Sequence, residues 1–392
     1  MNKKQFVVSA LIGLALYLIS TGLSFGIFKA LGVGGAGGIL SLRGGTGSGN
    51  QDHFLVDPGA PKTESCPING KLFTKQEREI WEKRRPLAVM IENHAESRPQ
   101  SGLSSADVVY EAVAEGGITR FMGIFYCGIA TPVNLAPVRS ARTYYLPWVL
   151  EYDALYNHVG GAGRCNDPTV DERAKALCQI EQWDVKDMDQ FSISFPTCYR
   201  NYDRLDRPVA TEHTMVCVTD KLTKLAADRG WTNVDAAGVA WDKDFEQWKF
   251  KDDAKEQDRG QSFSASFSAW KGYEREYGVR WDYDRANNVY LRFNGGTAHM
   301  DLETNQQLSA KNIVIFFARE IGPVDDHAHL LYNNTGSGQG LLFQDGKVVE
   351  ITWRKPTRTD RTKFFDASGK EISFNRGQIW IEMLPTGTEV SY

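Results

Sequence analysis

The chain has 392 residues, of which 42% are hydrophobic, 24% charged and 11% aromatic, and its formal net charge is −4. This composition is typical of a globular protein with enough apolar residues to build a core. Leaving out Lys3 and Lys4 gives −6 for the remainder, whereas a general nucleic-acid-binding surface is basic, so we expect no nucleic-acid partner.

Residues 6–28 form an uncharged run of 23 residues behind Lys3 and Lys4. At 1.5 Å per residue a helix of this length spans a hydrocarbon core of about 30 Å. The two lysines favour a cytoplasmic tail at residues 1–5. We therefore predict a single transmembrane signal-anchor at residues 6–28, with the bulk of the chain outside the cytoplasm. The alternative is a cleaved signal peptide, although no Ala-x-Ala site follows the run.

Glycine dominates residues 32–50, which read GVGGAGGILSLRGGTGSGN. Glycine at this density disfavours both helix and strand, so it indicates a flexible tether. We expect a linker at residues 29–83, with a short helix at 75–83. The length of the remaining chain favours two domains behind this linker.

The first domain is predicted at residues 84–235. Apolar runs typical of strands alternate there with helical patterns and glycine turns. The expected strands are 87–91, 108–113, 118–126, 154–159 and 215–218, and the expected helices are 142–152, 168–177 and 220–229. This alternation predicts an α/β domain in which helices layer on a sheet.

The second domain is predicted at residues 245–392, after a polar and charged boundary region at 231–265. β-Branched and aromatic residues alternate with glycine turns, and few helical patterns occur. Asp345-Gly346 is a hairpin signal between two apolar runs. We therefore expect a mainly β, antiparallel domain or a small barrel.

All six cysteines precede residue 218, and no two of them form a C-x-x-C pair. In an extracytoplasmic chain an even number of cysteines indicates disulfide bonds, and six cysteines allow 15 pairings. We favour the local pairs Cys165–Cys178 and Cys198–Cys217. The alternative is that the cysteines are buried free thiols.

Charged and polar side chains lie at the ends of the apolar runs in residues 85–142. The candidate ligand-binding residues are Asn93, His94, Arg98, Asp107, Glu111, Arg120, Arg139 and Arg142. The planar guanidinium of arginine forms paired bonds with phosphate or carboxylate, so we predict an arginine-lined cleft that binds an anion. The alternative is that these arginines form structural salt bridges with nearby acids. No catalytic residue can be assigned, and no metal ligand is predicted.

The first domain resembles the N-terminal domain of the YerB-like family of bacterial envelope lipoproteins in RPLAVMIENHAESRPQSGLSSADVVYEAVAEGGITRFMGIF, PVRSAR and EYDALYNHVGG. The second resembles the C-terminal domain of that family in YDRANNVYLRFNGGTAHMDLETNQQLSAKNIVI and GSGQGLLFQDGKVVEITWRK. The resemblance implies a protein at the bacterial cell membrane without an assigned chemistry. This chain departs from the family in having an anchor segment and no lipid-attachment cysteine behind it.

The order of elements around Thr119-Arg120 and residues 157–161 is also similar to that of the LytR-CpsA-Psr envelope phosphotransferases. That resemblance implies that Arg120, Arg139 and Arg142 contact a polyprenyl pyrophosphate, with a cofactor Mg²⁺ near Asp107 or Glu111. The aspartate that follows the first arginine in those proteins is replaced by Phe121-Met122.

Two functions follow from these patterns. The preferred one is a non-catalytic module that binds an envelope polymer, lipid or protein partner. The other is an enzyme that acts on polyprenyl-pyrophosphate-linked glycopolymers.

Overall fold

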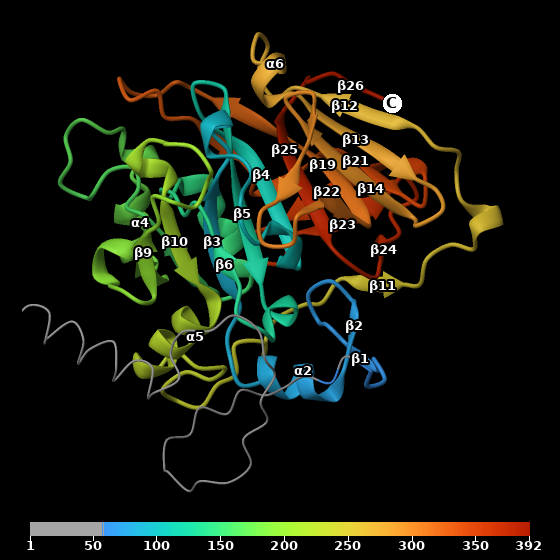
Figure 1. The fold of residues 1–392 in the computed structure, drawn as a ribbon. Helices are drawn as coiled ribbons and strands as arrows, with labels where there is room; N and C mark the ends of the chain where they lie inside the picture. Colours follow the sequence, from blue (N-terminus) through green and yellow to red (C-terminus); the bar gives the residue numbers. More distant parts are fainter. Residues whose placement is uncertain (1–56, 58) are drawn as a thin grey trace, which may run out of the picture. The chain divides into compact units, whose positions relative to one another are not determined.

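An eleven-stranded mixed sheet forms the centre of the computed structural model, which describes residue 57 and residues 59–392 (Figure 1). The strands lie in the order β23-β22-β21-β19-β25-β4-β5-β3-β7-β8, and β20 pairs with β19. The first half of the chain supplies β3 (Leu87–Glu92), β4 (Val108–Glu115), β5 (Ile118–Phe125), β7 (Leu155–His158) and β8 (Lys186–Asp189). The second half supplies β19 (Asn312–Ile321), β20 (Leu331–Asn333), β21 (Gly336–Gln344), β22 (Lys347–Lys355), β23 (Lys363–Asp366) and β25 (Ile379–Pro385).

The two halves meet where β25 pairs with β4 in parallel, from Ile379 opposite Val108 to Glu382 opposite Glu111. Both strands are buried along almost their whole length. Their backbone groups would be costly to leave unpaired there, and the shared ladder satisfies them. The region expected to separate domains 84–235 and 245–392 therefore connects two parts of one continuous sheet.

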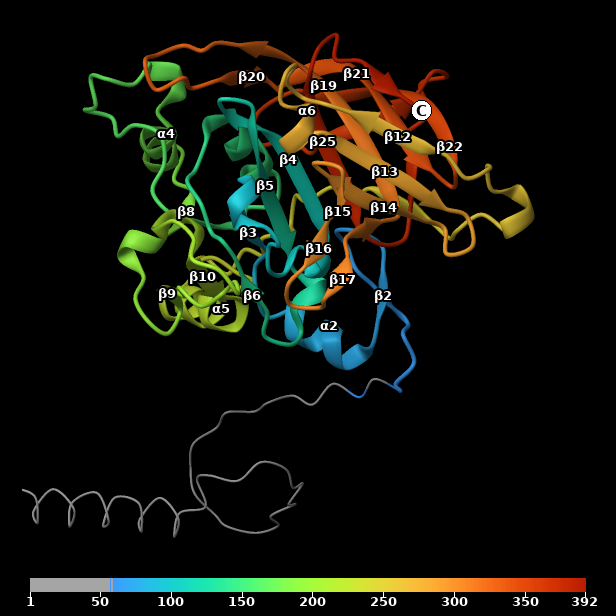
Figure 2. The same cartoon turned by 45° about the horizontal axis from the view of Figure 1, so that its top comes forward.

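A second sheet of six strands covers part of one face of the central sheet (Figure 2). Its strands are β12 (Ser264–Phe267), β13 (Val279–Asp284), β14 (Val289–Asn294), β15 (Thr297–Ala298), β18 (Ser309–Ala310) and β26 (Val390–Ser391). Buried and partly exposed residues alternate along β13 and β14, as expected for strands that pack on one face. The two sheets meet at Trp281 and Trp380, whose rings lie edge to face with centroids 5.2 Å apart.

Among the described residues the helices are few and short, so this part of the chain is β-rich, as expected for the second half but to a greater degree than expected for the first. They are α2 (Lys75–Trp81), α3 (Leu146–Glu151), α4 (Ala176–Gln182), α5 (Thr219–Asp228) and α6 (Glu274–Tyr277). Smaller sheets contain β1 (Glu64–Ser65), β2 (Leu72–Phe73), β6 (Asn134–Leu135), β9 (Cys198–Arg200), β10 (Met215–Val218), β11 (Lys249–Lys251), β16 (Met300–Asp301), β17 (Gln306–Gln307) and β24 (Ser373–Asn375). Eight 3-10 helices connect these elements: η1 (Ala95–Ser97), η2 (Leu103–Ser105), η3 (Cys127–Ile129), η4 (Thr143–Tyr145), η5 (Glu172–Ala174), η6 (Gln190–Ser192), η7 (Thr211–His213) and η8 (Glu256–Asp258).

The predicted membrane anchor at residues 6–28 lies outside the described residues. Among the described residues no helix is long and apolar enough to cross a membrane.

The expected linker at residues 29–83 contains regular structure from residue 64 onward, namely β1, β2 and α2. Thr74 and Glu77 form a capping box that starts α2. Trp81 at its end is buried and packs edge to face on Phe73 at 5.3 Å. A capped helix with a buried aromatic anchor belongs to the folded body, which therefore begins before residue 84.

Three disulfide bonds join all six cysteines. The favoured local pairs Cys165–Cys178 and Cys198–Cys217 are confirmed, and the third bond links Cys66 to Cys127. The predicted hairpin is also confirmed, because Asp345 and Gly346 connect β21 to β22 with φ of 53° and 69°, the geometry of a type I′ turn.

Candidate functional site

Glu92 and Arg120 lie opposite each other in the register of β3 and β5. Their side chains share a face of the sheet with the buried Met90 and Met122, which lie two residues away in the same strands. Arg120 is 4% exposed, and its Nη1 donates to the carbonyl oxygen of Ser140 at 3.0 Å. A buried guanidinium at the end of a strand thus meets the chain segment that carries the next two arginines.

Arg139 and Arg142 lie on either side of that contact. The amide of Arg139 donates to the carbonyl oxygen of Met90 at 2.9 Å, which fixes the segment beside β3. The Nε of Arg139 lies 3.1 Å from Oε1 of Glu92. Arg142 forms a close ion pair with Glu115, whose other oxygen lies 3.6 Å from Arg120. We call these five residues the arginine cluster: Glu92, Glu115, Arg120, Arg139 and Arg142.

Both acids of the arginine cluster are held in their ionised form. Burial opposes ionisation of Glu92, but a hydrogen bond from His213 and the charges of Arg139 and Arg120 keep its pKa below the usual value. Burial likewise opposes ionisation of Glu115, and the charges of Arg120 and Arg142 lower its pKa. Three guanidinium groups thus face two carboxylates, which leaves one positive charge unbalanced within the cluster.

The outer arginines of the cluster are accessible from solvent. The exposed fraction of the side chain is 29% for Arg139 and 11% for Arg142, whereas Arg120 is buried below them. The Nε of Arg120 has no hydrogen-bond partner among the described residues. The cluster therefore has an unbalanced positive charge near the surface and an unpaired donor buried beneath it.

Two histidines adjoin the arginine cluster through Glu92. The Nδ1 of His213 lies 2.8 Å from Oε2 of Glu92, and the ring of His94 stacks on that of His213 at 4.9 Å. His94 follows β3 and caps η1, whereas His213 ends η7, so the pair joins segments about 120 residues apart in the sequence.

Asn93, Arg98 and Glu111 lie on the opposite face of the sheet from the arginine cluster. Successive residues of a strand point to opposite faces, so Asn93 points away from the side of Glu92. Its Oδ1 accepts a bond from Nε of Arg98 at 3.0 Å, and its Nδ2 donates to Thr119 at 2.7 Å. The structure thus divides the predicted arginines into a group of three and the separate Arg98.

Arg98 is engaged in structural contacts. It donates to the carbonyl oxygens of Asn93 and Glu276 and lies over the ring of Tyr277. Burial lowers its pKa to about 10. These bonds hold β3 to the C-terminal half and leave Arg98 outside the arginine cluster.

Glu111 belongs to a buried ion-pair triad that the sequence reasoning missed. Arg292 of β14 lies 2.7 Å from Oε2 of Glu111 and 2.9 Å from Oε1 of Glu382 on β25. Burial and the charge of Glu111 raise the pKa of Glu382 well above its usual value. We therefore assign one negative charge to the two acids, which Arg292 balances.

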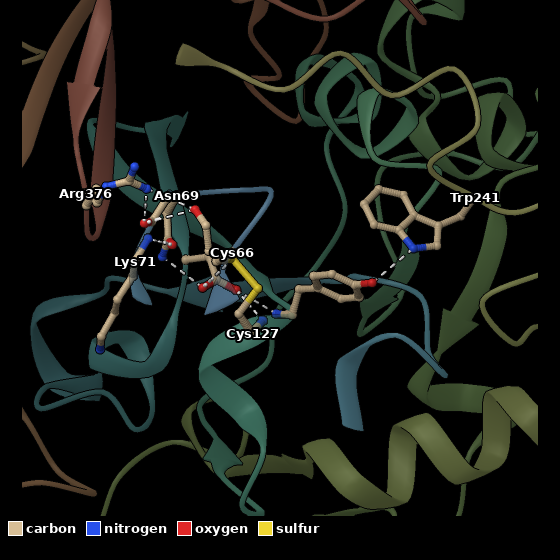
Figure 3. The surroundings of a disulfide bond; sticks show 10 residues. Cys66, Asn69, Lys71, Cys127, Trp241 and Arg376 are labelled. Atoms are coloured by element: carbon tan, nitrogen blue, oxygen red, sulfur yellow. Dashed lines mark hydrogen bonds between the residues drawn. A yellow bond between two sulfur atoms is a disulfide. The ribbon is translucent and has the colours of Figure 1, made fainter. Parts of the chain in front are cut away.

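Asp107 lies at the other end of β4, beside the Cys66–Cys127 disulfide, the surroundings of which are shown in Figure 3. One of its oxygens accepts bonds from the amides of Tyr126 and Cys127 at 2.8 and 2.9 Å. The other accepts a bond from Asn69 at 2.9 Å. Burial raises the pKa of Asp107 to about 6. Its role is to fasten the β1–β2 segment, and it does not reach the arginine cluster.

Several open cavities of the described chain lie elsewhere, and two of them are lined in part by aromatic residues. One, of about 730 Å³, is lined by the ends of β12 and the C-terminal residues, including Phe267 and Ser391. The other, of about 440 Å³, is lined by Trp241, Phe245 and Arg361, among others. Neither is lined by a residue of the arginine cluster, which forms part of a surface rather than of these two cavities.

His213 was not among the predicted site residues. Its hydrogen-bond partner, Glu92, lies 121 residues away in the sequence. Glu92 and Glu115 could be found as acids at strand ends, but their pairing with particular arginines depends on strand register.

Comparison with known proteins identifies two matching family models. The model described as the N-terminal domain of a protein of unknown function (DUF3048) matches residues 73–232, and that of the C-terminal domain matches residues 269–381. A relative from Bacillus subtilis (strain 168), named "Putative lipoprotein YerB", is 28% identical over 329 residues, which cover 84% of this chain and 88% of the relative. The crystal structure of YerB from Bacillus subtilis is similar with a TM-score of 0.66 at 27% identity, covering 84% of this chain and all of that one.

Proposed function

This chain belongs to the DUF3048 family, and we propose that it is a bacterial cell-envelope protein that binds an anionic ligand at the arginine cluster. The observation that carries the proposal is the meeting of Arg120, Arg139 and Arg142 on one face of the sheet, with two acids to balance three positive charges.

The extracytoplasmic location is supported by two observations. The relative from Bacillus subtilis is named as a lipoprotein, and three disulfide bonds are typical of an oxidising compartment.

Cys66 is the first cysteine of the chain and is bonded to Cys127, so it is not available for a lipid. We propose that residues 6–28 anchor the chain instead. N-terminal sequencing of membrane-extracted protein tests this, and a mature chain that starts between residues 20 and 45 would contradict it.

An anion is the ligand that this arrangement favours. Arg139 and Arg142 expose part of their guanidinium groups, and each is fixed by a carboxylate on its inner side. A guanidinium that is already oriented loses less side-chain entropy when it binds phosphate or carboxylate. Binding of an anion would also offset the unbalanced charge of the cluster.

Binding, rather than catalysis, is the function we propose. The alternative, a phosphotransferase, placed Asp107 or Glu111 near a magnesium ion. Asp107 accepts backbone and asparagine bonds beside a disulfide, and Glu111 pairs with Arg292 on the other face. Neither acid lies with the three arginines, so no specific observation favours phosphoryl transfer.

Calorimetric titration of the full-length chain with a series of anions tests the proposal. Pyrophosphate, inorganic phosphate, a dicarboxylate and a short polyprenyl phosphate separate a phosphate preference from a general response to charge. We expect saturable binding of at least one phosphate-bearing anion, with an affinity that falls as salt is added because the contact is partly exposed. Failure of every anion to bind at low salt would contradict the proposal.

A further inference from the structure

Three groups with metal-ligand chemistry lie beside the arginine cluster. His94, Glu96 and His213 each place a ligand-type atom within 4.8 Å of the others. His94 and Glu96 come from the start of η1 and His213 from the end of η7. Two imidazoles and one carboxylate, brought together from distant segments, form a donor set that suits zinc and similar divalent ions.

His213 is oriented for coordination. Its Nδ1 lies 2.8 Å from Oε2 of Glu92, and a carboxylate oxygen accepts, so in the neutral ring this nitrogen carries the proton and donates. The other nitrogen, Nε2, then has a free lone pair and lies 3.9 Å from Oε2 of Glu96. A carboxylate that fixes the tautomer of a histidine in this way is the usual support of a metal-binding imidazole.

His94 is placed beside this lone pair. Its ring stacks on His213 with an interplanar angle of 17°, and its Nδ1 accepts a bond from the amide of Glu96 at 3.2 Å. Coordination through either ring nitrogen of His94 replaces this one long hydrogen bond. The lone pairs of imidazole lie in the ring plane, so the His94 ring must also turn out of its stack on His213 before both rings can bind the same ion.

Two of the three groups are accessible from solvent, and the η1 backbone is held. The side chain of Glu96 is 67% exposed, His94 is partly exposed and His213 is buried beneath them. Arg207 donates to the carbonyl oxygens of Glu96 and Arg98, both at 2.9 Å, which fastens the η1 segment. An ion can thus reach the three groups from solvent, and the η1 backbone is already fixed when it does.

We propose that His94, Glu96 and His213 bind one divalent transition-metal ion, of which Zn²⁺ fits the donors best, with Glu92 as the positioning residue for His213. Three protein ligands leave one position of a tetrahedral zinc ion open for water or a ligand. Metal binding at this site requires no bound anion, so it can be tested independently of anion binding at the arginine cluster.

Zinc titration of the full-length oxidised chain against a chromophoric chelator tests the proposal. The protein is first treated with EDTA, and no reductant is used, so that all six cysteines remain in disulfides and do not compete for the ion. We expect saturation at one zinc ion per chain in the absence of any phosphate.

The variants separate the site from adventitious binding. E96Q alters an exposed side chain and should leave the fold unchanged while weakening zinc binding at least about tenfold. H94Q/H213Q should abolish the single site, and E92Q should weaken it about 10- to 100-fold, as expected for a group that orients a metal ligand. The matched control is H327Q, because His327 is an exposed histidine of another loop, and it should bind zinc as the wild type does.

Two results would overturn the proposal. One is the lack of saturable binding of a single zinc ion by the wild type. The other is a zinc affinity of E96Q and H94Q/H213Q equal to that of H327Q, provided that circular dichroism shows these variants to be folded. Calorimetry with pyrophosphate in EDTA measures anion binding separately, so failure of either function is distinguishable from failure of the other.

Discussion

Arg292 donates a buried hydrogen bond to Glu111 across 2.7 Å, although the two residues are 181 positions apart in the chain. Glu111 lies in the segment matched by the N-terminal family model and Arg292 in the segment matched by the C-terminal one. The bond runs from the second sheet to the central sheet. One ion pair therefore helps to hold the two family segments together as a single folded body.

Substitution R292M should destabilise the whole body by about 3–5 kcal/mol, because it leaves the charge of Glu111 buried without a partner. Urea unfolding followed by circular dichroism measures the change. The control is R275M, since the side chain of Arg275 is 94% exposed and such a change is usually worth within about 0.5 kcal/mol. Two separate unfolding transitions in the wild type would contradict the single-body interpretation.

Removal of the Cys66–Cys127 disulfide should cost more stability than removal of Cys165–Cys178. The bonds close loops of 61 and 13 residues, for which chain entropy predicts losses of about 4 and about 3 kcal/mol. Urea unfolding of C66A/C127A and C165A/C178A tests the order. Equal losses would indicate that native contacts such as those of Asp107, rather than chain entropy, determine the contribution.

The charge of Glu115 should stabilise the fold at neutral pH. Burial raises its pKa, but Arg120 and Arg142 outweigh this effect and hold the pKa below the usual value for a glutamate. A carboxyl whose pKa is lowered by folding contributes stability above its unfolded pKa, and that contribution disappears as pH falls through the folded pKa. E115Q should therefore lower the unfolding free energy at pH 7 and reduce its decline below about pH 4.5. A decline parallel to that of the wild type would show that Glu115 is not the titrating group.

The strands that carry the candidate site were predictable from local patterns. Apolar runs indicated 87–91 and 118–126, and the structure has Leu87–Glu92 and Ile118–Phe125. The sequence also marked Arg120, Arg139 and Arg142 as charged residues at the ends of such runs. Periodicity and turn residues act over a few positions, so a single sequence contains this information.

The sequence indicated less clearly which face of the central sheet each predicted site residue lies on. Glu92 and Asn93 are neighbours in the sequence, yet one contacts Arg139 and the other Arg98. The two-residue period of a strand separates them, and this rule was available once β3 had been predicted. The predicted strand ended at residue 91, so the period has to be extended by two residues to place Glu92 and Asn93 on opposite faces.

The contacts between distant segments could not be predicted from one sequence. Nothing local indicates that Glu382 on β25 lies opposite Glu111 on β4, or that His213 meets Glu92. Arg292 could be recognised from the sequence pattern, because it occupies a buried position in the alternation of β14. A charge at such a position requires a buried partner. The identity of that partner depended on how the two sheets pack.

The central claim is that the arginine cluster binds an anion, and pyrophosphate titration of R139Q/R142Q tests it most directly. The control is R280Q, because Arg280 is another carboxylate-paired arginine with a partly exposed side chain. A charge-assisted contact is worth about 1.5–3 kcal/mol, so pyrophosphate should bind R139Q/R142Q at least about tenfold more weakly than it binds R280Q and the wild type. Equal affinity of the folded R139Q/R142Q and R280Q variants would contradict the account and identify the arginines as structural.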